Sequence, residues 1–578
     1  MSTTGIYGLS GSGIDVDSMV KVGMLTKQNQ YDKMYKEEVK NEWKKEAYSD
    51  LYSSINSFNQ TTLSNYKMSS TTSPMTATSS SEGVATATAN ADAASMSHTV
   101  TVTSLASNAY LQTNDSGITR GASTTTEKST SINLKDVLYS KTDLETQQAA
   151  YDRMSDTEKE RVALSFTISD GASDDTNAKS ATISFTYEEL FGSDSTLNDL
   201  ASKIKNSGVN IQASYDSVND SFSLYQKSGG KANQINLTVT NRADDGGDGT
   251  EGSVTYASDS DNRARTLLNN LNLAAVTTGA DGTQSLTDIA DFDDTTADQT
   301  VSTKGTDGEV TIDGKKYTAT SSKLTVGNVA YTIGAKGTTT VTVSQDTDKL
   351  VENVKKFVED YNKMIDALNT KYYETQYDDY GVLTKSQEAG MSQEQITKWN
   401  EKAKSGLLYH DSQLGKIISS MREALYTPVE DTGSDYNTMM SLGISSSTDQ
   451  GHITLDETKL KKAIAADPNA VRSVFAASGD VTNKDGTTST DYNKEGVMNR
   501  ISDALYANLK TLKSYAGDSS ETADGSTLGT LIENLKTKMS DFKVQMTAYE
   551  NLLYDKYDAM ETAIQRLGVQ MGYITGGN

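Results

Sequence analysis

The C-terminal stretch of the sequence carries a long and regular apolar pattern. An apolar or aromatic side chain recurs there about every 3.5 residues, the period of coiled coils rather than the 3.6 of a free helix. The positions are Leu528, Ile532, Leu535, Met539, Phe542, Met546, Tyr549, Leu553, Tyr557, Met560, Ile564, Leu567, Met571 and Ile574. A helix of this length is about 70 Å long, far beyond the diameter of a small domain. We therefore predict a coiled-coil helix that needs a partner helix; a core helix of an ordinary bundle is the alternative.

The N-terminal stretch supplies a partner for that helix. Apolar side chains recur mostly at steps of four, and no proline interrupts them: Val16, Val20, Met24, Tyr31, Tyr35, Val39, Trp43, Ala47, Leu51, Ile55 and Phe58. Each step of four rotates the stripe by about 40° on a helix. The sequence predicts a helix from Val16 to about Tyr66, with a bend, a break or a change of partner near Glu37 to Trp43. The two ends of the chain are predicted to pack on each other.

Between these ends the apolar pattern changes to a period of two, which predicts mainly antiparallel sheet. Asp313-Gly314 predicts a hairpin turn, and Leu197 to Ile204 predicts a short helix. The acidic stretches Asn241–Gly252 and Thr277–Thr306 are expected to be loops. The predicted strands lie at 98–103, 181–187, 211–215, 222–224, 235–239, 310–312, 329–333 and 341–343.

Helical patterns return after Asp346, so the sheet region is an insertion in a helical stalk. We predict an α+β multidomain chain, in which a helical coiled-coil stalk built from both chain termini carries an inserted, mainly antiparallel β head. The predicted parts are a terminal coiled-coil leg (1–42 with 528–578), a helical stalk domain (43–75 with 345–527), a β domain (76–115 with 250–344) and a β-rich head domain (116–249).

Composition argues against several classes of function. The net charge of −25 disfavours binding to nucleic acid or to anionic membrane surfaces. Without cysteine the chain has no disulfide, thiolate metal site or cysteine nucleophile. No run of about 20 apolar residues and no signal peptide is present, which predicts a soluble cytoplasmic protein unless specialised machinery exports it. The only histidines, His98, His410 and His452, lack the spacing of metal ligands, so we expect no catalytic, metal or cofactor site.

Several short segments occur in this order along the chain: Gly11–Asp15, Thr99–Ala106, Phe357–Ile365, Gly406–Leu414, Ser441–Ile444, Gly451–Asp456, Asp467–Val471 and Val474–Phe475. Together they resemble the flagellar hook-associated protein 2 family, the filament cap proteins (FliD). A further pair, Thr196–Leu200 with Val209–Asp216, is similar to a repeat of flagellins and hook-associated proteins. Residues 116–180 and 241–306 show no clear match.

The resemblance implies a non-enzymatic assembly factor at the distal tip of the bacterial flagellum, outside the cell. It implies a homo-oligomeric ring, most simply a pentamer, that retains exported flagellin and promotes its folding and polymerisation. The helical termini would be legs and the β domains a plate. The implied partners are flagellin, the hook-filament junction proteins and an export chaperone on the C-terminal helix, with export by the flagellar secretion system and without a cleaved signal peptide.

Two other functions remain open from the sequence. One is another axial flagellar component, such as a hook-filament junction protein or a flagellin; a flagellin would share the helical ends but not the Ser441 to Phe475 segment. The other is a surface adhesin with a coiled-coil stalk, and cell adhesion is also compatible with a cap as a secondary role. In each case the assembly residues are expected on the two terminal stripes: Val16, Val20, Met24 and Tyr31, with Leu528, Ile532, Leu535, Met539, Phe542, Met546, Tyr549, Leu553, Met560, Ile564 and Leu567.

Overall fold

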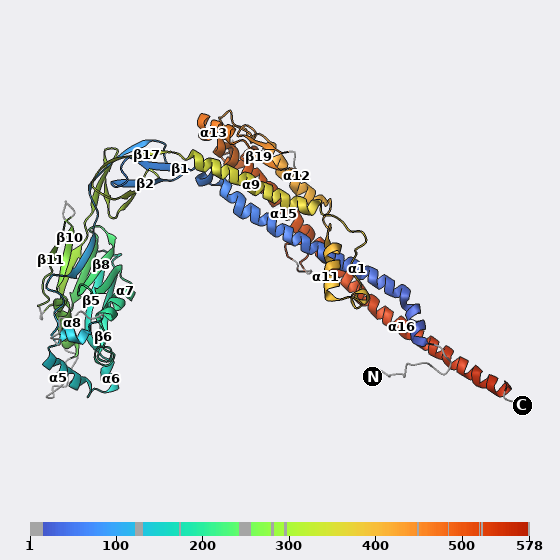
Figure 1. The fold of residues 1–578 in the computed structure, drawn as a ribbon, viewed down its shortest axis with the longest axis horizontal. Helices are drawn as coiled ribbons and strands as arrows, with labels where there is room; N and C mark the ends of the chain where they lie inside the picture. The colour runs from blue at the N-terminus through green and yellow to red at the C-terminus, as the bar shows by residue number, and fades with distance from the viewer. Residues whose placement is uncertain are drawn as a thin grey trace. The chain divides into compact units, whose positions relative to one another are not determined.

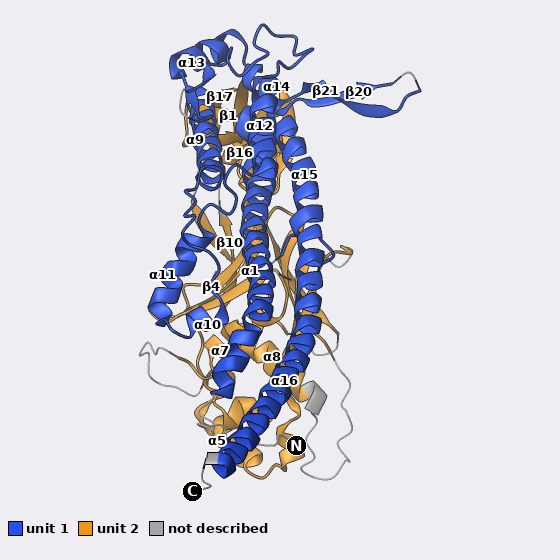
Figure 2. Ribbon diagram, turned by 90° about the vertical axis from the view of Figure 1, so that its right-hand side faces the viewer, with its two compact units in different colours: residues 1–74, 345–578 blue, residues 75–344 orange. Residues whose placement is uncertain are grey.

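The computed structural model of the chain describes residues 15–121, 131–172, 175–241, 256–278, 283–293, 297–447, 450–483, 485–519, 521 and 524–575. The chain divides into two compact units (Figure 2). Unit 1 contains both chain ends, residues 1–74 and 345–578, and unit 2 is the middle, residues 75–344. The predicted β insertion in a helical stalk is confirmed. The segment 11–14 of the first resembling motif and the acidic stretch 242–252 lie outside the described residues.

The two longest helices of unit 1 come from opposite ends of the chain and lie side by side (Figure 1). The first is α1 (Val16–Ser57), which continues through a π-helix, η1 (Phe58–Leu63), into α2 (Ser64–Lys67) and α3 (Ser69–Thr72). The Asp15 carboxylate caps α1 by accepting a hydrogen bond from the Ser18 N–H at 3.0 Å. The second is α16 (Thr527–Thr575). Both predicted terminal helices are therefore confirmed.

Helix α1 is unbroken between Glu37 and Trp43, and it changes its partner instead. Lys536 on α16 donates to Glu42 at 2.6 Å, whereas the Tyr48 ring packs edge-on against Tyr515 of α15 (Val497–Ala516), with centroids 5.6 Å apart. The first half of α1 thus lies on α16 and its second half on α15. The change of partner falls just after the predicted segment.

The second half of α1 belongs to the main core of unit 1. Buried side chains of α1, α9, α12 and α15 meet there, among them Ile55, Phe357, Met421 and Leu505. The other elements of this unit are α9 (Thr347–Tyr372), α10 (Lys385–Glu388), α11 (Gln393–Lys404), α12 (Ser412–Tyr426), β18 (Ile444–Ser446), β19 (Ile453–Leu455), α13 (Glu457–Ala466), α14 (Ala470–Ala476), β20 (Ser478–Thr482) and β21 (Thr488–Glu495).

Unit 2 contains two groups of sheets, each with its own buried core. The first group has a sheet in the order β1-β17-β3-β13-β14 and a second sheet in the order β15-β16-β2. The predicted turn between β13 and β14 is confirmed, since Asp313 and Gly314 have φ of 50° and 81°. The strands are β1 (Met75–Ser79), β2 (Ala85–Ala89), β3 (Ser97–Ser104), β13 (Gly308–Ile312), β14 (Lys315–Ala319), β15 (Lys323–Val326), β16 (Val329–Ile333) and β17 (Gly337–Gln345).

The second group has sheets in the orders β11-β10-β4-β8-β7 and β12-β9-β5-β6. The predicted short helix is confirmed as α7. The elements are β4 (Asn108–Thr113), α4 (Leu134–Leu138), α5 (Lys141–Tyr151), α6 (Asp156–Lys159), β5 (Val162–Gly171), β6 (Ser180–Thr186), η2 (Glu188–Gly192), α7 (Leu197–Asn206), β7 (Ile211–Asp216), β8 (Ser221–Gly229), β9 (Asn233–Val239), α8 (Tyr256–Asn270), β10 (Leu273–Thr278), β11 (Gln284–Asp288) and β12 (Gln299–Lys304).

Two expectations about the middle of the chain need correction. Residues 277–306 are not one loop, because β11 and β12 form there and pair with β10 and β9. Residues 108–113 and 256–304 join the second sheet group, whereas we expected 76–115 and 250–344 to form the other β domain together. The hydrogen bonds of β10 to β4 and of β12 to β9 fix this assignment. We therefore move 108–113 and 256–304 to the head in the four-part division, which otherwise stays a prediction.

Candidate functional site

Helices α1 and α16 form an antiparallel pair whose register is fixed by polar contacts along its length. At one end the Tyr554 hydroxyl donates to Asp17 at 3.1 Å. Further along, Lys536 on α16 lies 2.6 Å from Glu42 and 3.4 Å from Glu38. Burial is the main cause that raises the pKa of Glu38 above its ordinary value, and the neighbouring Glu42 carboxylate raises it further. The two ends of the chain are therefore held together by one continuous interface.

The apolar stripe of α16 is packed along only part of its length. Ile564 and Leu567, predicted as seam residues, are 37% and 59% exposed, and exposure rises to 80% at Ile574. The other predicted residues are buried or half-buried. Leu528, Ile532, Leu535, Met539, Leu553 and Val20 are buried, whereas Phe542, Met546, Tyr549, Met560, Val16, Met24 and Tyr31 are half-buried.

The expectation of one packed stripe is thus corrected for its last turns. The Asp17–Tyr554 contact places the start of α1 beside Tyr554. Helix α16 continues to Thr575, about 30 Å farther along its axis. Its last apolar side chains therefore extend beyond the start of α1 and remain solvent-accessible.

The two helices pack closely at Gly23. A Cβ at this position would lie 2.7 Å from Cδ1 of Leu553, so the missing side chain makes room for the leucine. The Lys27 ammonium lies 5.3 Å from the centre of the Phe542 ring and 5.8 Å from that of Tyr549, which is cation–π distance. A glycine and a lysine thus complete a seam for which the sequence showed only the apolar members.

A buried lysine joins α1 to the junction between α15 and α16. The Lys45 ammonium donates to the Ala516 carbonyl at 2.6 Å, forms an ion pair with Asp524 and lies 3.4 Å from the Ser526 hydroxyl. Burial raises the pKa of Asp524, but hydrogen bonds from Lys45 and Ser526 outweigh it, and the pKa lies below its ordinary value. Sequence reasoning missed Lys45, because nothing distinguishes it from the surface lysines of the same helix.

The turn at this junction depends on Gly517. Its φ of 81° lies in the left-handed region, and a Cβ would lie only 1.7 Å from an Asp524 carboxylate oxygen. Only glycine therefore lets the aspartate reach Lys45. Together these residues fix where the stalk core ends and the α1–α16 pair begins.

A second buried cation fixes the β20–β21 hairpin, which projects from the helices (Figure 2). The Arg500 guanidinium donates to the carbonyls of Tyr492 and Asn493 at 2.7 Å each. It also donates to the carbonyls of Thr427 at 2.6 Å and Pro428 at 2.9 Å. Burial lowers its pKa. The hairpin base is thus fixed to the loop after α12 by main-chain contacts, which leave no signal in the sequence.

The segment between α9 and α12, residues 373–411, contacts α1. The Lys385 ammonium lies 5.5 Å from the centre of the Tyr35 ring, and the Lys404 ammonium lies 5.4 Å from the centre of the Trp43 ring. Lys404 also pairs with Glu46 at 2.8 Å. These contacts explain why the apolar stripe of α1 drifts, since Tyr35 and Trp43 face this segment.

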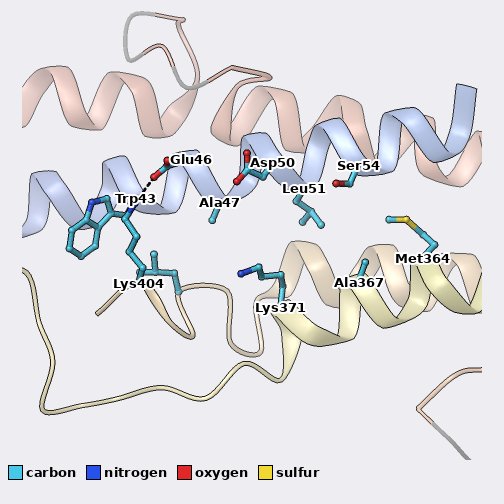
Figure 3. A pocket seen from close by; sticks show the side chains of 11 residues that line it. Trp43, Glu46, Ala47, Asp50, Leu51, Ser54, Met364, Ala367, Lys371 and Lys404 are labelled. Atoms are coloured by element: carbon cyan, nitrogen blue, oxygen red, sulfur yellow. Dashed lines mark hydrogen bonds and ion pairs between the residues drawn. The ribbon is translucent and has the colours of Figure 1, made fainter. Parts of the chain in front are cut away.

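Beside that segment, a groove of about 380 Å³ lies between α1 and α9 and is open to solvent (Figure 3). Its floor is apolar and contains small side chains, and its rims are charged. Asp50 on α1 and Lys371 on α9 project from opposite walls (Figure 3). The lining residues are Trp43, Glu46, Ala47, Asp50, Leu51, Ser54, Met364, Ala367, Lys371, Lys404 and Leu407.

The three histidines make local contacts. His98 Nδ1 lies 2.6 Å from Asp313, and this hydrogen bond lowers the pKa of the carboxyl. His452 Nε2 lies 2.6 Å from Asp366, and His410 packs against the rings of Tyr372, Tyr373 and Tyr409. Within the described ranges, no cluster of three or more metal-binding side chains occurs. None of the helices described combines the length and the hydropathy of a membrane span.

Comparison with known proteins relates both ends of the chain to one family. Residues 12–109 match the model of the flagellar hook-associated protein 2 N-terminus, and residues 305–568 match that of its C-terminus. A flagellar hook-associated protein 2 of Halalkalibacterium halodurans is 29% identical over 263 residues, covering 43% of this chain and 49% of that protein. A B-type flagellar hook-associated protein 2 of Pseudomonas aeruginosa is 26% identical over 296 residues, or 48% and 56% of the two chains. The matched region spans about half the length of these curated relatives.

Solved structures resemble this one more distantly. A crystal structure of the D1-D2-D3 domains of the flagellar cap protein FliD from Escherichia coli has a TM-score of 0.45 at 18% identity and covers 85% of this chain and 99% of that one. The structure of FliD (HAP2) from Pseudomonas aeruginosa has a TM-score of 0.25 at 17% identity, covering 51% and 99%. The family assignment comes from the sequence models, which together match more than half of the residues; the chain belongs to the flagellar hook-associated protein 2 family.

Proposed function

We propose that this chain is a flagellar filament cap, a structural assembly factor at the distal tip of a bacterial flagellum, outside the cell. It assembles as a homo-oligomeric ring, a pentamer, that retains exported flagellin and promotes its folding and polymerisation. Membership of the family supports this role. The observation that carries it is the α1–α16 pair, which joins both chain ends into one rod while the β domains are inserted between them.

In this proposal the α1–α16 pair is a leg that engages the growing end of the filament. The turns of α16 after Met560 expose apolar side chains. Because exposed apolar surface of this kind marks an interaction site, these turns are the part of the leg that contacts other subunits. The sheet groups of unit 2 form the plate that covers arriving flagellin. The four-part division into leg, stalk, β domain and head is proposed with 108–113 and 256–304 assigned to the head.

The proposed partners are flagellin, the hook-filament junction proteins and an export chaperone that covers the C-terminal helix before assembly. Export uses the flagellar secretion system. A chain without cysteine carries no disulfide that would prevent unfolding for passage through a narrow channel. The role is structural rather than enzymatic, and nucleic acid and membranes are not among the partners.

The test is a chain that ends at Tyr549, produced in a bacterium that lacks its own cap protein. Removing residues 550–578 deletes the exposed turns of α16 and the Tyr554 contact with Asp17. We expect no filament growth and unpolymerised flagellin in the medium, measured by electron microscopy and immunoblotting. Full-length chain with Val544→Ser, a change at a 70% exposed position on the same helix, is the control and should restore filaments. Normal filaments from the truncated chain would refute the leg.

A further inference from the structure

We propose that the groove between α1 and α9 receives Tyr506, on helix α15 of a neighbouring copy of this chain. The Tyr506 side chain is 70% exposed, and the groove is open to solvent over an apolar floor that includes Leu51 and Met364. The inference deepens the proposed ring and rests on that part of the proposed function. It identifies a contact that holds the stalks of two neighbouring copies side by side.

Two hydrogen bonds fix the level of α15 along α1. The Lys45 ammonium donates to the Ala516 carbonyl at 2.6 Å. In η1, the continuation of α1, the Asn59 amide donates to the Ser502 carbonyl at 3.3 Å. The two contacts are separated by equal lengths of chain on the two helices, in opposite directions. The helices therefore run antiparallel and in step, with the same rise per residue.

This register places Tyr506 and the groove at the same height on the stalk. Tyr506 is about 1.5 Å beyond the level of Ser54, and Lys510 is level with Leu51. Trp43 and Ser54 mark the two ends of the groove on α1 (Figure 3). Rotation about an axis along the stalks keeps every residue at its own height. A ring of parallel stalks therefore presents α15 of one copy level with the groove of the next.

The groove and α15 lie on opposite sides of α1. The residues of α1 that contact α15 include Lys45 and Tyr48, whereas those that line the groove include Trp43, Ala47 and Asp50. At 100° per residue the first group lies roughly 160° around α1 from the second. A chain therefore cannot fill its own groove with its own α15. Contact between two copies joins different surfaces, which is the head-to-tail kind that closes into a ring when the rotation allows.

The shape of the groove suits one large side chain on an approaching helix. Ala47 and Ala367 lie on facing helices (Figure 3) and leave space that a tyrosine ring fills, as ridges fill grooves in helix packing. Ser54, at the end that Tyr506 meets, has a hydroxyl that can accept a hydrogen bond from the tyrosine O–H. Tyrosine is a common anchor of protein interfaces, because it combines a large apolar ring with a polar tip.

The charges beside the groove match those beside Tyr506. The rim on α1 carries the acids Glu46 and Asp50, and the opposite rim is basic (Figure 3). Glu46 pairs with Lys404 of its own chain at 2.8 Å, so Asp50 is the exposed acid that a neighbour meets. Lys510 follows Tyr506 by one helical turn and is within about 1.5 Å of the level of Asp50. The charges thus favour the approach that brings Lys510 to the α1 rim.

Photo-cross-linking in the full-length chain tests this contact. Tyr506 is replaced by p-benzoylphenylalanine, a bulkier aromatic residue that bonds to a neighbouring C–H group on irradiation. Labelled and unlabelled chains are mixed, so that mass spectrometry distinguishes bonds between copies from bonds within one. We expect an adduct from position 506 of one copy to Met364 or Leu51 of another. The matched control carries the same probe at Val544, which is also 70% exposed, and should form no adduct with the groove.

Charge reversal gives a second readout on chains that remain folded, since Lys510 and Asp50 are exposed. Lys510→Glu should weaken self-association about tenfold, and adding Asp50→Lys should restore it, measured by analytical ultracentrifugation. Rings that form no adduct between position 506 and a neighbour's groove would overturn this inference alone. Self-association that Lys510→Glu leaves unchanged would also overturn it. Natural chains that stay monomeric would refute the proposed ring as well.

Discussion

Lys45 shows how one buried charge positions a long helix. Its ammonium contacts the last carbonyl of α15 and the acid that precedes α16. We expect Lys45→Met to lower the free energy of unfolding by about 3 to 5 kcal/mol, because Asp524 and the Ala516 carbonyl lose their partner in a buried site. Urea denaturation followed by helical circular dichroism measures this. The matched control is Lys40→Met, an exposed lysine of the same helix, with an expected change below about 0.5 kcal/mol. Equal effects would show that Lys45 contributes no more than a surface lysine.

The same ion pair predicts a dependence of stability on pH. The folded-state pKa of Asp524 lies below its ordinary value of 3.8. The stabilisation is therefore complete above the unfolded-state pKa and is lost as the pH falls through the lower folded-state value. Asp524→Asn removes this titration. We expect the variant to lose less stability than the natural chain between pH 5 and pH 2, measured by urea midpoints at each pH. Parallel curves for the two chains would contradict the assignment.

The hydrogen bonds of Arg500 predict that the β20–β21 hairpin is held rigidly at its base. Replacing Arg500 with Met leaves four part-buried carbonyls without their charged donor. We expect a loss of about 2 to 3 kcal/mol of stability, since a hydrogen bond to a charged group contributes about 1.5 to 3 kcal/mol and water replaces part of the lost bonding at these part-buried carbonyls. Amide hydrogen exchange in the hairpin should become faster while that of α16 stays unchanged. Arg422→Met, at an exposed arginine, is the control, and slow exchange in the Arg500 variant would refute the anchoring role.

At the scale of elements, periodicity predicted both terminal helices because a stripe repeated over many turns has few alternative structures. It also indicated that α1 could not face one partner throughout. It did not show which partners α1 has: Tyr35 and Trp43 contact lysines of the 373–411 segment. Such a pairing depends on side chains far apart in the sequence. The groove was missed for the same reason, because its walls come from α1 and α9.

The seam between the terminal helices predicts the effect of charges placed in it. Leu553 is buried against Gly23, and Met560 is half-buried near the end of the interface. We expect Leu553→Asp with Met560→Asp to destabilise the α1–α16 pair by about 3 kcal/mol or more, because a carboxylate loses its hydration there. Thermal unfolding and limited proteolysis of α16 measure the effect. Val544→Asp, at an exposed position on the same helix, should change neither, and unchanged helicity in the double variant would mean that the stripe is not a packed seam.

At the scale of the molecule, the helical stalk and the inserted sheets followed from the sequence, but the grouping of the strands did not. Strand β11 is exposed at every residue, so it lacks the alternation that marks a strand with one buried face. Strand β10 pairs with β4, which lies far away in the chain. Such pairings depend on the fit of two distant segments rather than on the local pattern of either. Lys45 and Arg500 were missed because the sequence does not distinguish a buried lysine or arginine from an exposed one.

The point where the chain leaves and re-enters unit 1 predicts that the two units fold separately. The Asp346 N–H donates to the Pro74 carbonyl at 2.9 Å, so the ends of the insertion are adjacent within unit 1. A short glycine-rich linker in place of residues 75–344 therefore closes a small gap at low entropic cost. We expect the shortened chain to keep the helical dichroism of unit 1 and its free energy of unfolding within about 1 kcal/mol. Two calorimetric transitions in the intact chain, of which only one survives the excision, would agree with this expectation. Loss of the cooperative helical transition would instead show that the helices need the β insertion in order to fold.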